Sequence, residues 1–136
     1  MRSLSLLGVL ALMSCRVGDP FAPTVDKMAG TYIAHQMVTV DTAGFVNWLD
    51  AGGSLTLTLS ADGSLSGRLF LPGGAAGGGD LEADMAGSWL LIGHTIQFGQ
   101  VADTFVRDMD FIADQDRISG DQYFGTSLRV IIVLTK

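Results

Sequence analysis

The side chains best suited to acid–base or metal chemistry are few in this 136-residue chain. The two histidines, His35 and His94, lie far apart, the first in a predicted strand and the second in a predicted turn. Zinc sites draw on cysteine and histidine ligands at short spacing, and the single cysteine, Cys15, is close to neither histidine. We therefore expect both histidines to be structural, and we predict no metal site and no cofactor.

Aspartates supply the other possible ligands. Asp108 and Asp110 fall on the same side of a predicted strand, and Asp114 and Asp116 flank a predicted turn. Carboxylate oxygens of this kind can hold calcium. The run lacks the order of an EF-hand loop, however, and it is flanked by two arginines. A solvated outer face with a turn cap is the favoured interpretation, and a calcium site is the alternative.

No serine lies in the surroundings of a hydrolase nucleophile. The segment 63–67 has the glycine spacing of a nucleophile elbow, but Leu65 stands at the nucleophile position. Nothing near the acidic residues indicates an apolar pocket that would raise a carboxyl pKa for catalysis. A formal net charge of -6 argues against binding to nucleic acid. We predict that the protein is not an enzyme and that it does not bind nucleic acid.

The elements that would position these residues are predicted to be strands. The chain has 18 glycines and only 16% charged residues, a composition that favours turns over helices. Leu55, Leu57 and Leu59 alternate with polar residues, which is the period of a half-buried strand. Gly63 can take the positive φ of a tight turn before a second strand at 65–71.

Later segments repeat this alternation of strand and turn. Further strands are predicted at 31–40, 81–85, 89–91, 95–98, 108–113, 117–123 and 127–134, and residues 42–51 could form a short helix or an irregular crossing. Regular short strands indicate a sandwich or barrel, and closure removes exposed edges. We predict an all-β fold, a small antiparallel up-and-down β-barrel of about eight strands over residues 29–136.

The predicted interior is apolar and bulky. In the phase of the first alternating strand it contains Leu55, Leu57, Leu59, Leu65, Leu69, Leu71, Leu81, Met85, Trp89, Leu91, Ile96, Phe98, Met109, Phe111, Ile118, Leu128, Val130, Ile132 and Leu134. Gly67 and Gly120, inside strands, are expected to mark bends or bulges. An eight-stranded barrel is just wide enough to be filled or to hold one small ligand. Both alternatives stay open at this point.

Two short motifs resemble the lipocalin-like (calycin) β-barrels. Gly30-Thr31-Tyr32 stands where that family has Gly-x-Trp on its first strand, and Arg129 lies on the predicted last strand. The resemblance implies a closed barrel in which Arg129 packs across Tyr32. It also implies binding of a small apolar ligand.

Aromatic side chains are the predicted contacts for such a ligand. Phe45 and Trp48 lie between the first two long strands, where a lipocalin-like barrel has its entrance loop. Trp89, Phe98 and Phe111 belong to the predicted interior. A cavity of ~300 Å³ or more opening near Trp48 would favour ligand binding, whereas a filled interior would favour a structural or protein-binding role.

The first fifteen residues resemble the signal peptide of bacterial lipoproteins. Arg2 precedes the apolar stretch 4–13, which is too short to cross a bilayer as a helix. Leu12-Met13-Ser14-Cys15 is similar to a lipobox, which implies cleavage after residue 14 and lipidation of Cys15. In the Gram-negative lipoproteins that this segment resembles, an aspartate after the cysteine marks retention in the inner membrane. Arg16 stands at that position here, so the resemblance implies the outer membrane. An ordinary secretory signal or a buried N-terminal segment are the alternatives.

Residues 15–28, with Pro20 and Pro23, are predicted to carry the lipid and to form a flexible tether. The whole pattern predicts an exported, lipid-anchored envelope protein, facing the periplasm or the cell surface, with the membrane as partner through its anchor. It would be non-enzymatic and would bind a small apolar ligand or an envelope component. The alternative is a structural or protein-binding lipoprotein with a filled barrel, such as a hydrolase inhibitor.

Overall fold

The computed structural model describes residue 20 and residues 22–136. The predicted signal peptide 1–14, and the predicted lipidation site at Cys15, lie outside the described residues. In the described part no helix is long and apolar enough to span a membrane.

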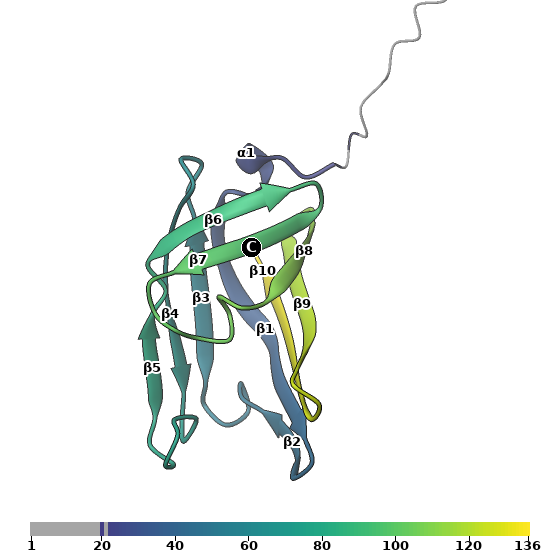
Figure 1. Ribbon diagram of the computed structural model, residues 1–136. Helices are drawn as coiled ribbons and strands as arrows, with labels where there is room; N and C mark the ends of the chain where they lie inside the picture. Colours follow the sequence, from purple (N-terminus) through teal and green to yellow (C-terminus); the bar gives the residue numbers. More distant parts are fainter. Residues whose placement is uncertain (1–19, 21) are drawn as a thin grey trace, which may run out of the picture.

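Within these residues the chain forms one antiparallel sheet of ten strands, which closes on itself (Figure 1). Eight strands follow one another around the barrel in chain order, and β10 pairs with β1 to close it. The closed strands are β1 (Gly30–Asp41), β3 (Ser54–Leu59), β4 (Ser64–Leu71), β6 (Gly87–Ile92), β7 (Thr95–Gln100), β8 (Asp110–Asp114), β9 (Arg117–Phe124) and β10 (Leu128–Thr135). The predicted antiparallel up-and-down barrel is confirmed.

Two short strands extend the wall at one end. β2 (Gly44–Asn47) pairs with the second half of β1, whose first half pairs with β3. β5 (Leu81–Asp84) pairs with the second half of β4, whose first half pairs with β6. The sequence prediction of a helix or irregular crossing over 42–51 was wrong at 44–47, because these residues continue a hairpin with β1.

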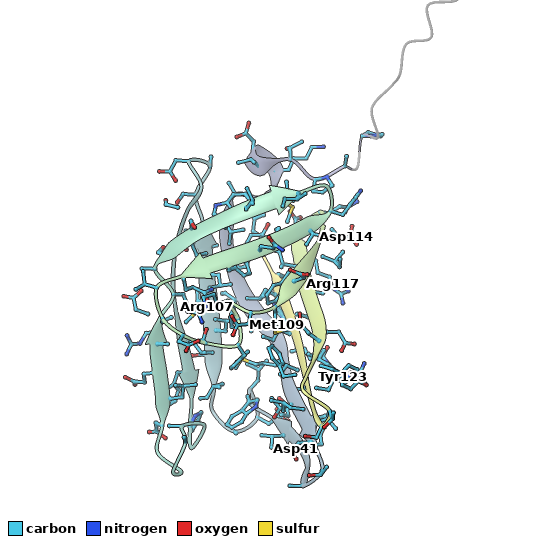
Figure 2. The ribbon with its side chains drawn as sticks, in the orientation of Figure 1. Asp41, Arg107, Met109, Asp114, Arg117 and Tyr123 are labelled. Atoms are coloured by element: carbon cyan, nitrogen blue, oxygen red, sulfur yellow. The ribbon has the colours of Figure 1, made fainter. Side chains whose placement is uncertain are left out.

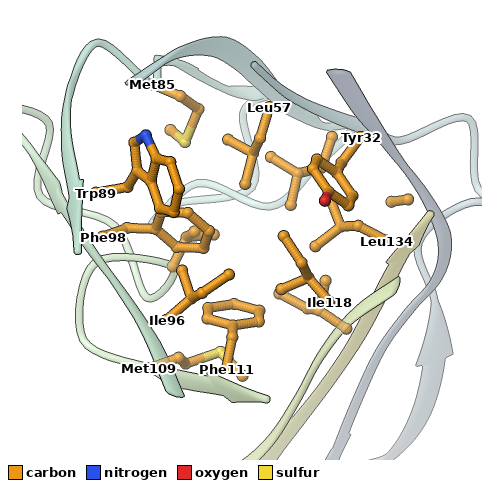
Figure 3. Close-up of a cluster of buried hydrophobic side chains, with 14 of the residues drawn as sticks. Tyr32, Leu57, Met85, Trp89, Ile96, Phe98, Met109, Phe111, Ile118 and Leu134 are labelled. Atoms are coloured by element: carbon orange, nitrogen blue, oxygen red, sulfur yellow. The ribbon is translucent and has the colours of Figure 1, made fainter. Parts of the chain in front are cut away.

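Side chains fill most of the barrel (Figure 3). Alternation places Leu55, Leu57 and Leu59 of β3 inward, each at most 1% exposed. Nearly all of the predicted interior positions are buried, and Leu81, Leu91 and Leu128 are partly buried against the core. A filled interior is what close packing of bulky apolar side chains produces in a barrel of this strand number.

One irregularity in β1 keeps the inward-facing side chains of this 12-residue strand directed at the core. The pairing register with β10 shifts between Ala34 and Gln36, so that His35 is an extra residue in the strand. Such a bulge changes the alternation by one position, and Ala34 and Met37 can therefore both be buried. Gly67 and Gly120 were predicted to mark bends or bulges, and the pairing of β4 with β3 and of β9 with β10 runs through them without a bulge. Gly67 instead allows close approach, since a Cβ there would lie 2.0 Å from the Thr56 carbonyl oxygen.

A short helix covers the end of the barrel where β1 begins, called here the closed end (Figure 1). α1 (Val25–Met28) starts at its N-cap Thr24, whose hydroxyl accepts a hydrogen bond from the Lys27 amide. Met28 is fully buried in the core. Helix α1 therefore occupies the last four residues of the segment predicted to be a flexible tether.

Candidate functional site

The opposite end of the barrel holds an apolar depression, the mouth recess. Its volume is about 260 Å³, and it is lined by Thr39, Asp41, Trp48, Leu71, Gly74, Leu81, Phe105, Leu128 and Val130. These residues come from β1, β4, β5 and β10, from the β2–β3 and β4–β5 connections and from the segment between β7 and β8. The recess is therefore framed by the barrel wall and by connections at the end away from α1 (Figure 1).

The floor of the recess is continuous with the core. Val130 and Leu71 are 1% and 3% exposed and belong to the main core cluster. Trp48, Phe105 and Leu128 are partly buried and pack against that cluster. An apolar group entering the recess would therefore extend the packed interior rather than occupy a separate cavity.

Trp48 is held in place by hydrogen bonds at three of its atoms. Its backbone N–H donates to the Met37 carbonyl at 2.9 Å, and its own carbonyl accepts from the Gly53 amide at 2.7 Å. The indole Nε1 donates to Thr39 Oγ1 at 3.0 Å. Because its polar group is already satisfied by the protein, the indole can present its apolar surface to the recess with little loss of side-chain freedom.

The charges around the mouth are mostly negative. Asp41 lines the recess, and its Oδ1 accepts from the Ala43 and Gly44 amides at 2.8 and 3.1 Å. Asp50 is exposed in the β2–β3 connection and Asp80 in the β4–β5 connection. Each of these connections also supplies a residue that lines the recess. None of these three carboxylates forms an ion pair with the residues that the structure describes.

The arginines in this half of the barrel are all engaged. Arg68 pairs with Glu82 at 2.9 Å, and Arg107 contacts Asp103 and Asp108. Arg129 forms a bidentate pair with Asp121, at 2.8 and 2.6 Å, on the outer wall. This pair lowers the pKa of the Asp121 carboxyl. No described basic side chain lines the recess.

The predicted ligand-binding aromatics do not form one site. Trp48 lines the recess, but Phe45 is 64% exposed on β2 and is not a lining residue. Trp89 is 5% exposed, and its Nε1 donates to the Ser60 carbonyl at 2.7 Å at the other end of the barrel. Phe98 and Phe111 pack edge to face in the core, with ring centroids 5.1 Å apart (Figure 3).

The family-motif prediction needs one correction. Gly30 and Tyr32 do lie at the start of the first strand, but Arg129 does not pack across Tyr32. Val130 faces inward, so its neighbour Arg129 points outward, where its guanidinium lies 5.6 Å from the centre of the Tyr123 ring.

Lys136 supplies the cation over Tyr32, with Nζ 5.7 Å from the ring centre. It also donates to the carbonyls of Lys27 and Ala29, at 2.7 and 3.1 Å. The Tyr32 hydroxyl donates to the Met28 carbonyl at 2.8 Å. These contacts join the last strand to α1 and seal the closed end.

The predicted acid–base and metal candidates remain separate in the structure. His35 is exposed at the β1 bulge and His94 is exposed in the β6–β7 turn, so neither is a buried structural histidine. Asp110 accepts a hydrogen bond from Gln97 at 2.9 Å. Among the described residues no group of three metal-ligating side chains comes together. Figure 2 shows Asp114 and Arg117 at one end of the barrel wall and Asp41 at the other.

Two larger hollows lie outside the barrel. One, of about 570 Å³, lies on the outer face of β8, β9, β10 and β1 and includes Asp110, Arg117 and Asp121. The other, of about 350 Å³, lies beside α1 and is lined by Pro20, Lys27 and neighbouring residues. The first is lined mainly by polar side chains. The second reaches the core at Met28 but is also lined by the charged Lys27 and Asp116. The mouth recess reaches the core through both Leu71 and Val130 and has no described basic side chain in its lining, which makes it the better candidate for an apolar ligand.

Sequence reasoning missed Phe105 as a lining residue. Phe105 lies between β7 and β8 in a segment with neither strand alternation nor a helical pattern. Leu71, Leu81, Leu128 and Val130 were predicted to face the interior. These four residues lie at or near the ends of strands. Their position at the open end of the barrel could therefore have been predicted from the sequence.

Comparison with models of known protein families, with curated protein sequences and with solved structures gives no significant match.

Proposed function

We propose that this protein is an exported, lipid-anchored envelope protein without enzymatic activity, which binds an apolar group in its mouth recess. The observation that carries the binding proposal is the continuity of the recess with the core, through Leu71 and Val130. The lipoprotein part rests on the resemblance of the first fifteen residues to a signal peptide ending in Cys15. A lipocalin-like ancestry is supported by the closed barrel and the Gly30–Tyr32 motif.

The volume of the recess limits the size of the ligand that it can hold. At about 260 Å³ it falls below the ~300–1,000 Å³ of pockets that enclose drug-sized ligands. It therefore suits one end of an apolar molecule, such as the tip of an alkyl chain, and leaves the remainder outside. This explains how a filled barrel and an apolar ligand are compatible.

Trp48 provides the test, because the chain has only two tryptophans and they lie at opposite ends of the barrel. In the variant Trp89→Phe, fluorescence reports on Trp48 alone. We expect primary alcohols of increasing chain length to change this signal. Their affinity should rise about fourfold per methylene, from ~0.8 kcal/mol each, and should level off once the recess is full.

Matched variants separate the recess from the outer wall. Leu128 lines the recess, and Leu90 is 55% exposed on the outside of β6. Leu128→Gln should weaken binding about fivefold, whereas Leu90→Gln should leave it unchanged. Equal effects of the two substitutions, or a Trp48 signal that no alcohol alters, would contradict ligand binding at the mouth.

Two observations favour the alternative, protein-binding function. The first is that the interior is filled and that the mouth recess, at about 260 Å³, is smaller than the ~300 Å³ expected of a ligand cavity. The second is the exposed edge of the sheet at β2. Phe45 and Val46 are 64% and 40% exposed on β2, and in the described residues β2 pairs only with β1. An exposed aromatic on a short edge strand is a suitable contact for a protein partner. Under this function the alcohols leave Trp48 unchanged, so the same titration distinguishes the two roles.

A further inference from the structure

We propose that the mouth recess selects apolar ligands that carry a positive charge, of the class of alkylammonium amphiphiles. This inference rests on the proposed function, because it adds a head-group preference to an apolar site. It follows from the side chains that border the opening, and three features support it.

The first feature is the combination of a carboxylate with aromatic rings in the recess itself. Asp41, Trp48 and Phe105 all line it. Ammonium groups are attracted both to carboxylates and to the faces of aromatic rings, and indole is the most effective of these rings. A chain whose length matches the depth of the recess would seat its tip on the apolar floor and place its head group among these side chains.

The second feature is that Asp41 is already fixed. Its Oδ1 holds the β1–β2 turn by accepting from the amides of Ala43 and Gly44. No hydrogen bond occupies Oδ2 in the described residues, so this oxygen is free to meet a cation. Little side-chain entropy is lost on binding when the carboxylate is held in advance.

The third feature is the balance of charge around the opening. Asp41, Asp50 and Asp80 have no ion-pair partner among the described residues, whereas Arg68, Arg107 and Arg129 are each paired with acidic side chains. A fatty acid would therefore bring its carboxylate to a negative rim where the described residues offer no unpaired cation. An ammonium head group would instead be attracted by the unpaired carboxylates at the rim.

The experiment compares three probes that share a ten-carbon chain and differ in head-group charge. Decyltrimethylammonium, decanol and decanoate are titrated below their micelle-forming concentrations into Trp89→Phe protein, with Trp48 as the reporter. We expect the cation to bind roughly fivefold more tightly than the alcohol, and decanoate to bind more weakly than either. The preference should shrink at ~1 M salt, where the Debye length is about 3 Å.

Variants that make the same charge change at different positions show which carboxylates cause the preference for the cation. Asp41→Asn keeps an oxygen that can accept the turn amides, and it should lower the preference for the cation about twofold. The triple variant D41N/D50N/D80N should remove most of it. Asp26→Asn makes the same charge change on α1 at the closed end, and it should have no effect.

The outcomes distinguish the two proposals. If decanol binds and the cation gains nothing over it, or if the triple variant keeps the full preference, the head-group inference is wrong and apolar binding stands. If none of the three probes alters Trp48, the proposed function itself fails. Trp48→Phe protein, in which Trp89 reports on the core, shows whether any signal comes from unfolding.

Discussion

At the scale of single residues, Tyr32 has a measurable effect on stability in alkali. Burial, together with the nearby charge of Asp116, raises the pKa of the Tyr32 phenol to about 12 from its ordinary value near 10. Below pH 10 the phenol is protonated in both folded and unfolded chains. Between pH 10 and 12 only the folded state holds the proton, so the free energy of unfolding falls by up to about 1.4 kcal/mol per pH unit.

Tyr32→Phe removes this titration. We expect the variant to lose less stability than the natural protein between pH 10 and 12, as measured by urea unfolding at several pH values. Parallel stability curves for the two proteins over that range would show that Tyr32 ionises as freely in the folded state as in the unfolded one.

Gln100 is the other residue with a specific energetic consequence. It is 4% exposed, and its Nε2 has no hydrogen-bond partner in the described residues. An unsatisfied buried donor costs about 1–3 kcal/mol. Gln100 Oε1 accepts from the Thr104 hydroxyl at 3.5 Å, a long and therefore weak hydrogen bond that methionine would also remove. Because the unsatisfied donor costs more than this bond contributes, Gln100→Met should raise the free energy of unfolding, by up to about 1 kcal/mol. Gln97→Met, at an exposed position of the same strand, should change it by no more than about 0.5 kcal/mol. Destabilisation by Gln100→Met would point to a bound water or polar ligand group at this amide.

Residue types predicted the core better than they predicted the site. Strand alternation correctly placed Trp89, Phe98 and Phe111 inside, but it could not show that they pack against one another and leave no room for a ligand. The same alternation already implied that Arg129 faces outward when Val130 faces inward. The resemblance to lipocalins was misleading for this position.

At the scale of elements, α1 and β10 depend on each other through Lys136. Lys136→Met removes two hydrogen bonds to carbonyls of the α1 region and the cation over Tyr32. We expect a loss of about 1–2 kcal/mol in unfolding free energy and faster amide exchange at Met28 and Ala29. Lys27→Met also removes two hydrogen bonds, to the carbonyls of Pro20 and Ala22 at 3.0 and 3.3 Å, but these do not connect α1 to β10. It should therefore have a smaller effect on exchange at Met28. Unchanged exchange at Met28 in the Lys136 variant would show that α1 is held by the burial of Met28 and its hydrogen bond from Tyr32, without Lys136.

Strand positions were predictable where the alternation was regular. The β3–β4 hairpin has six consecutive paired positions and a glycine turn, and both were visible in the sequence. β2 was not predicted, because its four residues show no alternation of apolar and polar side chains and three of them are exposed. The β1 bulge was also not predicted. Its extra residue, His35, is polar and lies between two stretches of alternating side chains, and nothing in the sequence distinguishes it from an ordinary outward-facing residue.

At the scale of the whole molecule, the mouth recess and α1 lie at opposite ends of the barrel (Figure 1). The described chain enters through α1 at the closed end, and the mouth recess opens at the other. If Cys15 is acylated as proposed, we expect the closed end, which carries α1, to lie nearer the membrane and the mouth to face away from it. A ligand would reach it from the aqueous side or from a second partner.

This orientation can be measured on lipidated protein reconstituted in vesicles. Lipids with a quencher on the head group should quench Trp89, near the closed end, more than Trp48. The single-tryptophan variants Trp48→Phe and Trp89→Phe separate the two signals. Stronger quenching of Trp48 would place the mouth at the bilayer and would contradict the proposed orientation.

Closure of the barrel could be predicted from the number and spacing of strands, and Trp48 was predicted to lie at its entrance, but the full lining of the mouth could not be predicted. The lining also depends on Gly74 in the β4–β5 connection and on Phe105, which is supplied by a segment without strand pattern. These depend on pairings between residues distant in sequence, which local patterns do not specify.

The most direct test of binding at the mouth is an NMR titration of the isotope-labelled protein with decyltrimethylammonium. We expect chemical-shift changes at Trp48, Leu81, Phe105 and Leu128, and none at Trp89 or Ile118. Changes centred on the outer wall or the closed end, or no changes at all, would contradict the account.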